Sequence, residues 1–183
     1  MKHLGTIKLE TEQLILRKLV ISDARSLYIN WASDPDVVKF MRLNLPKNIK
    51  ETENIINSFI EKYNNLETYR WGIELKEISE VIGFIGLSII SEYDMTADFA
   101  YTIGKKFWNK GYATEALRAV LDFGLNKVGF NRLEAYHSIN NMSSGKVMKK
   151  AGMKYEGRAR QKYKSHIGFE DCDIYAIIKD DLE

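Results

Sequence analysis

The sequence predicts a mixed α/β (α+β) domain built on a twisted, mixed sheet with helices on both faces. Segments with the period of a strand and segments with the period of a helix follow one another along the 183 residues. In the second half they alternate, which is typical of crossover connections and some parallel pairing. In the middle, strand patterns follow one another directly, which favours antiparallel pairing.

In the first half, a strand precedes two amphipathic helices that flank an irregular segment. The strand alternates Leu14 and Leu16 with Ile15 and Arg17. Ser22 is expected to cap the first helix, since its hydroxyl can accept a free backbone N–H. The expected ranges are 12–19 for the strand, 22–33 and 51–65 for the helices, and 34–49 for the irregular segment around the two prolines.

The second half begins with three strands in succession. In the last of them, Phe99 and Tyr101 share one face and Asp98 lies on the other. A helix starts at Gly111, and after a further strand a short helix ends at Gly152. The expected strands are 69–76, 80–90, 95–104, 131–139, 153–164 and 168–178. The element order is therefore β-α-α-β-β-β-α-β-α-β-β, with about seven strands in total.

Composition limits the class of protein. The chain is 45% hydrophobic and 28% charged with a net charge of +2, so its overall charge gives no reason to expect nucleic acid. We expect one domain over residues 1–183, without an internal linker. Cys172 is the single cysteine, and no Cys/His cluster has metal-ligand spacing, so neither a disulfide nor a metal is expected. The absence of a signal region and of about 20 consecutive apolar residues predicts a cytoplasmic protein without a membrane partner.

The stretch FWNKGYATEAL (107–117) places a small polar turn directly before a helix. Backbone N–H groups at such a junction point outward, and the helix dipole behind them attracts anions. Gly111 has no Cβ to block close approach, and Lys105, Lys106 and Lys110 add positive charge. A plain helix start with solvated lysines fits the same residues, and the usual phosphate motifs are absent from the sequence.

Other motifs stand in a fixed order around this turn. TEQLILRKL (11–19) comes first, then WNKGYA (108–113) with Thr-Glu-Ala after it, then FNRLEA (130–135), and then Asn141 and Ser144 with a closing Lys-Ala-Gly. In this order they resemble the Gcn5-related N-acetyltransferases (GNAT), specifically the RimJ/RimL-like branch, which includes ribosomal-protein N-terminal acetyltransferases. WNKGYA stands where the family has its acetyl-CoA signature Gln/Arg-x-x-Gly-x-Gly/Ala. The resemblance covers about residues 10–180 and implies the GNAT fold.

The resemblance implies acetyl-CoA as cosubstrate. Strand 95–103 would splay from strand 132–138, and the pantetheine arm would pair with the backbone exposed in the opening, as an added strand does. The turn would hold the pyrophosphate, and Asn141 would hold an amide of the cofactor. The implied cofactor-binding residues are Tyr101, Thr102, Ile103, Trp108, Asn109, Lys110, Gly111, Tyr112, Ala113, Thr114, Asn141, Ser144 and Lys150.

The implied reaction is direct attack of a primary amine on the thioester in a ternary complex. Ser144 would lie near the sulfur and donate to the leaving thiolate, whereas Asp98 and Glu134 are the candidate bases. Asp98 stands where the branch usually has glutamate and is shorter by one methylene. A solvated strand face or a salt bridge explains both acids equally well. His137 shares a face with core residues, and we interpret it as structural.

The acceptor would lie against the N-terminal helices. Trp31, Phe40 and Trp71 are the candidate lining residues, although aromatic residues at these spacings usually belong to a core. Asp34, Asp36, Glu51 and Glu53 would attract a cationic amine or simply cap helices. The acceptor class stays open between a protein N-terminal α-amine, a ribosomal protein included, and a polyamine, an antibiotic or another small amine.

Two alternatives belong to other classes. The first is an acetyl-CoA-binding module without turnover. The second is an RNA- or ribosome-binding protein, since residues 146–164 carry many lysines and arginines against one glutamate. Whichever function holds, an exposed strand edge near the C-terminus allows a homodimer.

Overall fold

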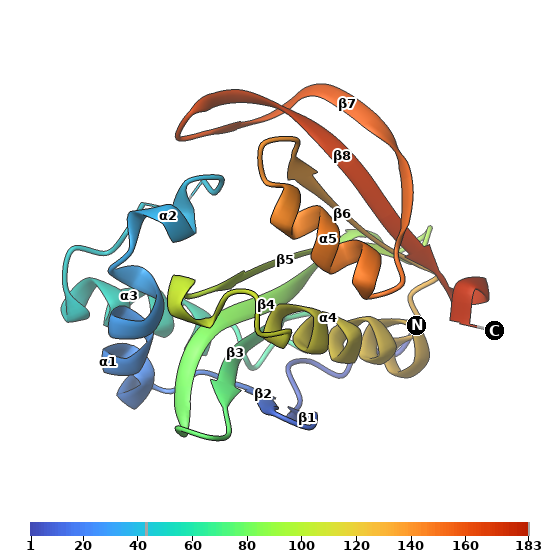
Figure 1. Ribbon diagram of the computed structural model, residues 1–183. Helices are drawn as coiled ribbons and strands as arrows, with labels where there is room; N and C mark the ends of the chain where they lie inside the picture. Colours follow the sequence, from blue (N-terminus) through green and yellow to red (C-terminus); the bar gives the residue numbers. More distant parts are fainter. Residues whose placement is uncertain (43, 183) are drawn as a thin grey trace.

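The computed structural model describes residues 1–42 and 44–182 (Figure 1). Its centre is one sheet of eight strands in the order β1-β2-β3-β4-β5-β6-β8-β7, in which only β5 and β6 pair in parallel. The strands are β1 (Leu9–Glu10), β2 (Leu14–Arg17), β3 (Tyr69–Leu75), β4 (Glu80–Ser91), β5 (Thr96–Ile103), β6 (Arg132–Ser138), β7 (Lys154–Ser165) and β8 (Gly168–Ile178).

The predicted mixed fold is confirmed, with eight strands in place of about seven. The additional strand is the two-residue β1, which is too short to show a period in the sequence. The α-helices are α1 (Ala24–Leu27), α2 (Pro35–Val38), α3 (Ile49–Ile60), α4 (Tyr112–Asp122) and α5 (Met142–Lys150). Short 3₁₀ or π-helical segments are η1 (Ile21–Asp23), η2 (Tyr28–Ala32), η3 (Lys105–Phe107), η4 (Phe123–Val128) and η5 (Lys179–Leu182).

The first helical segment starts differently from the prediction. Val20, not Ser22, occupies the N-cap position of η1. The carboxylate of Asp23 reaches back to the Val20 amide at 2.8 Å and also binds Arg17 through two bonds of 2.8 Å. Because Asp23 is buried and ion-paired, it fixes the start of this segment on the end of β2 more firmly than a serine hydroxyl could.

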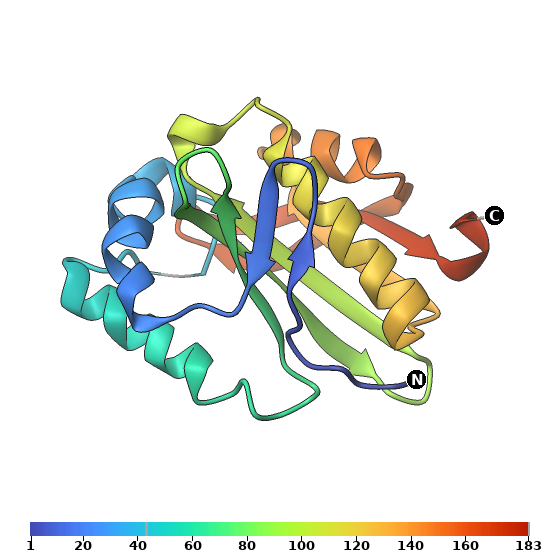
Figure 2. The same ribbon diagram turned by 90° about the horizontal axis from the view of Figure 1, so that it is seen from below.

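Helices cover both faces of the sheet, as the two views show (Figures 1 and 2). The main core lies between the sheet and α4, and it includes fully buried Tyr69, Trp71 and Phe123. A second core lies under α1, η2 and α3, where Trp31 and Ile56 are fully buried and Phe84 of β4 packs from the sheet. This burial provides the main driving force for the arrangement.

The sheet forks between β5 and β6. The two strands pair from Thr96 and Arg132 to Asp98 and Glu134, and their pairing ends there although both continue. Figure 1 shows β6 and β8 diverging from β5, with α5 above the opening. The divergence leaves the backbone of the second half of β5 without a strand partner on that side.

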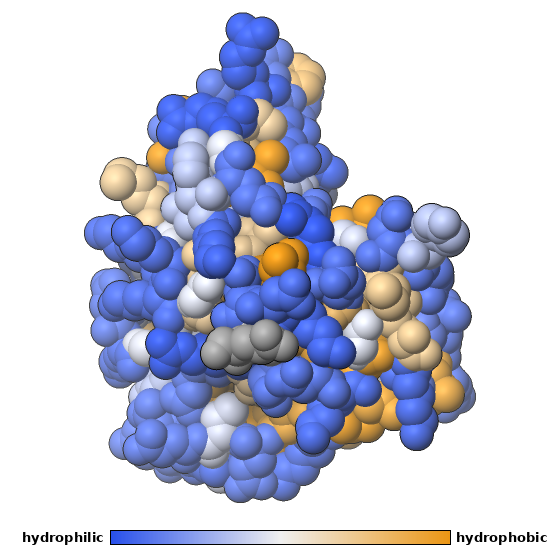
Figure 3. Space-filling model, turned by 90° about the vertical axis from the view of Figure 1, so that its right-hand side faces the viewer, coloured by the Kyte–Doolittle hydropathy of each residue, from blue (hydrophilic) through white to orange (hydrophobic). Residues whose placement is uncertain are grey.

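The β7–β8 hairpin rises above the rest of the molecule as a largely hydrophilic ridge (Figure 3). Its basic residues are partly paired: Arg158 binds Asp173 at 2.7 Å, and Lys154 forms an ion pair with Asp181. Among the described residues, no helix has the length and apolar character needed to cross a membrane.

Candidate functional site

Two carboxylates lie at the point where the pairing of β5 and β6 ends. Asp98 and Glu134 are the last paired residues of β5 and β6. Burial raises the pKa of Asp98 above its usual range, and the charge of Glu134 raises it further. A hydrogen bond from Ser88 acts in the opposite direction. Glu134 is held by Arg132, whose Nε lies 2.8 Å from its carboxylate. The charges of Arg70 and Lys162 act to lower the pKa of Asp98, but they are smaller influences than burial and Glu134.

On the other face of β5, a tyrosine spans the opening to α5. The hydroxyl of Tyr101 lies 2.9 Å from the Oγ of Ser144 and donates to the Ser144 carbonyl at 3.1 Å. Burial raises the pKa of Tyr101 to about 12, so its hydroxyl remains protonated at neutral pH. Two O–H groups therefore meet beside the fork. The single hydroxyl hydrogen of Tyr101 is donated to the Ser144 carbonyl, which leaves the Ser144 hydroxyl as the donor between the two oxygens.

The predicted phosphate turn contains two residues with left-handed backbone. Asn109 and Gly111 both have positive φ, +61° and +90°, and α4 begins at the next residue. Apart from Gly111 and its two chain neighbours, no atom of the described residues lies within 4 Å of where a Gly111 Cβ would be. The space in front of the α4 N-terminus is therefore open. The first amides of a helix have no partner inside it and attract anions.

Trp108 is not part of that row of free amides. Its backbone N–H donates to the Lys105 carbonyl at 3.1 Å, and its indole Nε1 donates to the Ile103 carbonyl at 2.7 Å. The indole thus connects the turn to the end of β5. A cofactor that contacts the Trp108 amide or the Ile103 carbonyl, as predicted, would have to compete with these bonds. The amides of Gly111, Tyr112 and the residues after them are better placed to receive a phosphate.

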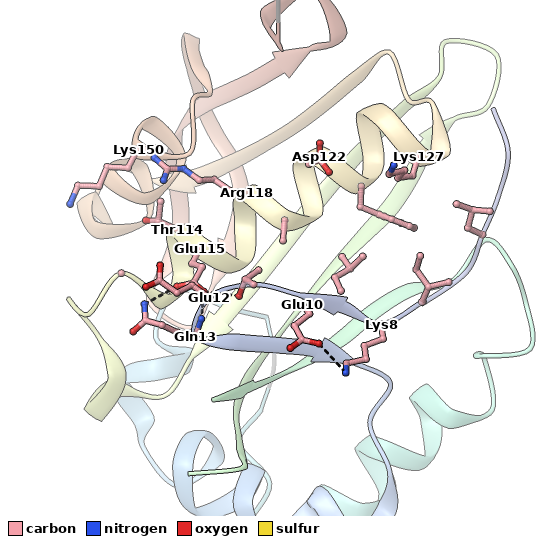
Figure 4. Close-up of a pocket in the computed structure, with 17 residues that line it drawn as sticks. Lys8, Glu10, Glu12, Gln13, Thr114, Glu115, Arg118, Asp122, Lys127 and Lys150 are labelled. Carbon is pink, nitrogen blue, oxygen red and sulfur yellow. Dashed lines mark hydrogen bonds and ion pairs between the residues drawn. The ribbon is translucent and has the colours of Figure 1, made fainter. Parts of the chain in front are cut away.

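A groove of about 930 Å³ runs along α4, between that helix and the β1–β2 hairpin (Figure 4). Gly111 and Thr114 line it, and Arg118 and Lys150 lie at its upper edge in Figure 4. An Arg118 nitrogen donates to the Lys150 carbonyl at 2.6 Å and so connects α4 to α5 at this edge of the groove. The sequence predicted Lys150 but missed Arg118, which lies two helical turns after Gly111.

Glu115 fixes the start of α4 to the N-terminal hairpin. Its carboxylate accepts bonds from the Thr11 hydroxyl at 2.6 Å and from the Gln13 amide and side chain at 2.7 and 2.8 Å. Burial acts to raise the pKa of Glu115, but these bonds outweigh burial and lower it. The phosphate turn is therefore attached to a second rigid element.

Asn141 lies at the N-cap position of α5 without capping it through its side chain. Its Oδ1 instead accepts the Ser143 hydroxyl at 2.8 Å. His137 is buried beneath the same helix and donates from Nδ1 to the Ser138 carbonyl at 2.7 Å. A Cβ on Gly145 would lie 2.4 Å from the His137 ring, so His137 packs against α5, in keeping with a structural role.

The three aromatic residues expected to line an acceptor slot have different places. Trp71 is fully buried in the main core and its Nε1 donates to the Ile7 carbonyl at 2.6 Å, so it is a packing residue. Trp31 is also buried, and its Nε1 donates to the Thr102 hydroxyl at 2.7 Å. Only Phe40 is partly exposed, and its carbonyl accepts the Tyr163 hydroxyl at 2.8 Å.

The Phe40–Tyr163 bond joins the segment after α2 to the β7–β8 hairpin. The ring of Tyr163 packs on that of Tyr136 with centroids 5.6 Å apart, and Arg42 lies over it at 5.4 Å. Sequence reasoning missed this contact because its partners lie at opposite ends of the chain. The acids considered for attracting a cation are engaged locally: Asp34 caps α2, Asp36 pairs with Lys105, Glu51 accepts the Lys47 amide and Glu53 pairs with Lys50.

Comparison with known proteins agrees with this geometry. The family model "Acetyltransferase (GNAT) domain" matches residues 13–154. The uncharacterized N-acetyltransferase p20 of Bacillus licheniformis is 30% identical over 171 residues, which cover 93% of this chain and 96% of that protein.

Solved structures are similar over nearly the whole chain. A GNAT-family acetyltransferase from Bacillus anthracis superposes with a TM-score of 0.82 at 25% identity, covering 95% of this chain and 99% of that one. The ribosomal-protein-S5-alanine acetyltransferase of Vibrio fischeri has a TM-score of 0.82 at 18% identity, covering 97% and 99%, and shares the fold. The chain therefore belongs to the GNAT acetyltransferase family and is an acetyl-CoA-dependent N-acetyltransferase.

Proposed function

We propose that the fork between β5 and β6 is the place of acetyl transfer, and that a primary amine attacks the thioester of acetyl-CoA there directly. The observation that carries the proposal is the arrangement of proton-handling groups around the fork. Tyr101 and Ser144 lie together on the α5 side. Asp98 is on the opposite face of β5, at the last pair before the strands part.

On the thiol side, Tyr101 and Ser144 donate to the leaving sulfur. Acetyl-CoA supplies the activated acyl group, and the C–S bond breaks as the C–N bond forms. A Tyr101 hydroxyl that stays protonated at neutral pH can stabilise or protonate the thiolate once its hydrogen turns from the Ser144 carbonyl to the sulfur. A hydrogen bond accepted from the Ser144 hydroxyl keeps the Tyr101 oxygen in place during this step. Ser144 is then the residue that orients Tyr101 and supplies a second O–H.

On the acceptor side, Asp98 accepts the proton that the amine loses. Its raised pKa brings it closer to the pH of the reaction than an exposed aspartate, and this improves a general base. How much help is needed depends on the acceptor. An α-amine with a pKa of about 7.8 is partly neutral near pH 7.5, whereas a lysine of pKa about 10.4 requires roughly 4 kcal/mol of assistance.

The cofactor fits the α4 side of the fork. The open space before Gly111 and the amides at the α4 N-terminus suit a pyrophosphate. Asn109, Lys110, Tyr112, Ala113 and Thr114 belong to the same turn. Lys150 and Arg118 are suited to the ribose 3′-phosphate. The backbone of residues 101–103 is proposed to pair with the pantetheine arm, and Asn141 to bind one of its amides.

For the acceptor, we favour the α-amine of a protein N-terminus. Asp98 is a modest base, because burial raises its pKa while the charges of Arg70 and Lys162 act to lower it. Such a base suits an amine that is already partly neutral. A protein of the same fold supports this choice: the Vibrio fischeri structure is named a ribosomal-protein-S5-alanine acetyltransferase. Phe40 and Trp31 are the proposed residues on this side, with Trp31 acting through its bond to Thr102.

The decisive experiment is thiol release from acetyl-CoA with a panel of acceptors: peptides beginning with Ala or Ser, polyamines, aminoglycosides and amino acids. We expect release above the hydrolysis blank with the peptides. Release only with a polyamine or an aminoglycoside would replace the proposed acceptor. No release with any acceptor, combined with stabilisation by acetyl-CoA, would indicate a binding module without turnover.

A further inference from the structure

Three potential metal ligands converge beside the β4–β5 turn. His3 of the N-terminal segment, Glu67 of the loop before β3 and Glu92 of the β4–β5 turn have their ligand atoms within 4.8 Å of one another. Nε2 of His3 is 2.9 Å from the Glu92 carboxylate. Because the residues are widely separated in the chain, the spacing rules that led us to expect no metal could not find this group.

The imidazole of His3 is oriented as it is in many metal sites. Its Nδ1 lies 2.7 Å from the hydroxyl of Tyr69, whose ring is fully buried. A histidine that binds a metal through Nε2 typically donates its Nδ1–H to a fixed oxygen, which sets the ring orientation. The ring of Tyr69 lies 6.0 Å from that of His3, centroid to centroid, so the imidazole is held by packing as well as by this bond.

The backbone around the three residues is held by bonds independent of their side chains. On either side of His3, the Lys2 amide donates to the Val128 carbonyl and the Gly5 amide to the Leu66 carbonyl, both at 2.8 Å. The Glu67 amide donates to Asn65 Oδ1 at 2.9 Å. The turn that carries Glu92 is closed by the Met95 amide, which donates to the Glu92 carbonyl at 3.2 Å.

We propose that His3, Glu67 and Glu92 bind a divalent transition-metal ion, and that this ion fastens the N-terminal segment to the β3 and β4–β5 ends of the sheet. One imidazole nitrogen and two carboxylates suit zinc, with water completing the tetrahedron. The two exposed carboxylates need only small rotations to reach zinc at about 2 Å. The metal takes the position of the proton between Nε2 and Glu92. The site has no part in the proposed acetyl transfer.

The test uses the full chain with its native N-terminus and no histidine tag, after treatment with a chelator. Calorimetric titration with zinc chloride is expected to give one ion per chain and a higher melting temperature. H3Q should abolish binding, and E67Q and E92Q should each weaken it by about 10-fold or more. The matched controls are E77Q, which removes another exposed acid, and H166Q, which removes another exposed histidine; both should bind as the parent chain does.

Cobalt provides a second readout, since its visible spectrum reports ligands directly and should lose intensity in H3Q. Should H3Q disturb the fold without metal, E67Q decides the matter, because Glu67 is exposed at a loop. Zinc binding that H3Q and E67Q leave unchanged would overturn the proposal. Absence of binding to the parent chain would also overturn it and leave His3 and Glu92 as an ordinary ion pair.

Discussion

The hydroxyl of Tyr101 lies 2.9 Å from the Oγ of Ser144, which joins the middle of β5 to the first turn of α5 across the opening in the sheet. No ladder bond connects β5 to β6 at this depth, because their pairing ends at Asp98 and Glu134. The side-chain bond therefore spans a gap that the backbone leaves open. It sets two donors on one side of the gap, and the proposed base lies on the other.

Tyr101→Phe should lower kcat by about 100-fold or more, because it removes the proposed proton donor, and should leave the KM for acetyl-CoA nearly unchanged. Steady-state kinetics with the best peptide acceptor measures both constants. Tyr93→Phe is the control, since Tyr93 is 95% exposed. Ser144→Ala should cost less than Tyr101→Phe. Equal activity of Tyr101→Phe and the parent enzyme would exclude Tyr101 as the donor.

Asp98→Asn should lower activity and raise stability at neutral pH. The pKa of Asp98 is raised in the folded state. Asp98 therefore stays protonated to a higher pH in the folded state than in the unfolded state. Stability therefore falls as pH rises from the unfolded pKa through the folded pKa. Asparagine has no proton to lose and avoids that loss. Urea unfolding at acidic and neutral pH should show a gain over the parent chain that appears only at neutral pH.

Glu134→Gln provides the complementary pH experiment. Removing this neighbouring charge should lower the pKa of Asp98, since Glu134 is the second cause of its rise after burial. The acid limb of the kcat/KM profile should therefore move to lower pH. A limb that stays in place in Glu134→Gln would show that another group controls it.

Gly111→Ala tests the phosphate turn separately from backbone strain. At φ +90° an alanine is strained by about 1–2 kcal/mol, and its Cβ enters the space proposed for the pyrophosphate. Gly129→Ala is a matched control because φ is +89° there. Both variants should lose similar stability, but only Gly111→Ala should raise the KM for acetyl-CoA. An equal rise of the KM for acetyl-CoA in both variants would show that general destabilisation, and not the phosphate turn, is responsible.

Much of the fold could be predicted because periodicity reports burial. The strand expected at 95–104 is observed as Thr96–Ile103, and the helix expected to end at Gly152 ends at Lys150, with Gly152 at φ +100°. Short elements were missed, namely β1 and α2, because two or four residues contain only about one period and cannot show a repeat.

The site could be predicted only where its residues are adjacent in the chain. The turn around Gly111 carries its own signature, and so does the loop holding Asn141 and Ser144. The Tyr101–Ser144 bond and the Phe40–Tyr163 bond join distant segments, and nothing in either segment alone indicates them. Trp71 shows the reverse error: an aromatic in a strand was considered for the acceptor, but it fills the core.

Arg118→Gln and Lys150→Gln should each raise the KM for acetyl-CoA but not for its 3′-dephospho analogue. Both side chains lie at the α4–α5 edge, where Arg118 binds the Lys150 carbonyl. Losing one exposed contact to phosphate removes about 1 kcal/mol, which is about a fivefold change in KM. Lys127→Gln, at the far end of the same groove, is the control. A rise with both cofactors would place the 3′-phosphate elsewhere.

Tyr163→Phe should weaken acceptor binding without affecting the cofactor. Its hydroxyl donates to the Phe40 carbonyl at 2.8 Å and so holds the segment after α2 against the β7–β8 hairpin. Losing a hydrogen bond of this kind costs about 1 kcal/mol of binding free energy, so the KM for the peptide should rise about fivefold. The KM for acetyl-CoA should stay constant. Tyr155→Phe is the control on the same strand, because Tyr155 is 53% exposed. If Tyr163→Phe changes the KM for acetyl-CoA and leaves the KM for the peptide unchanged, the acceptor does not bind between the segment after α2 and the β7–β8 hairpin.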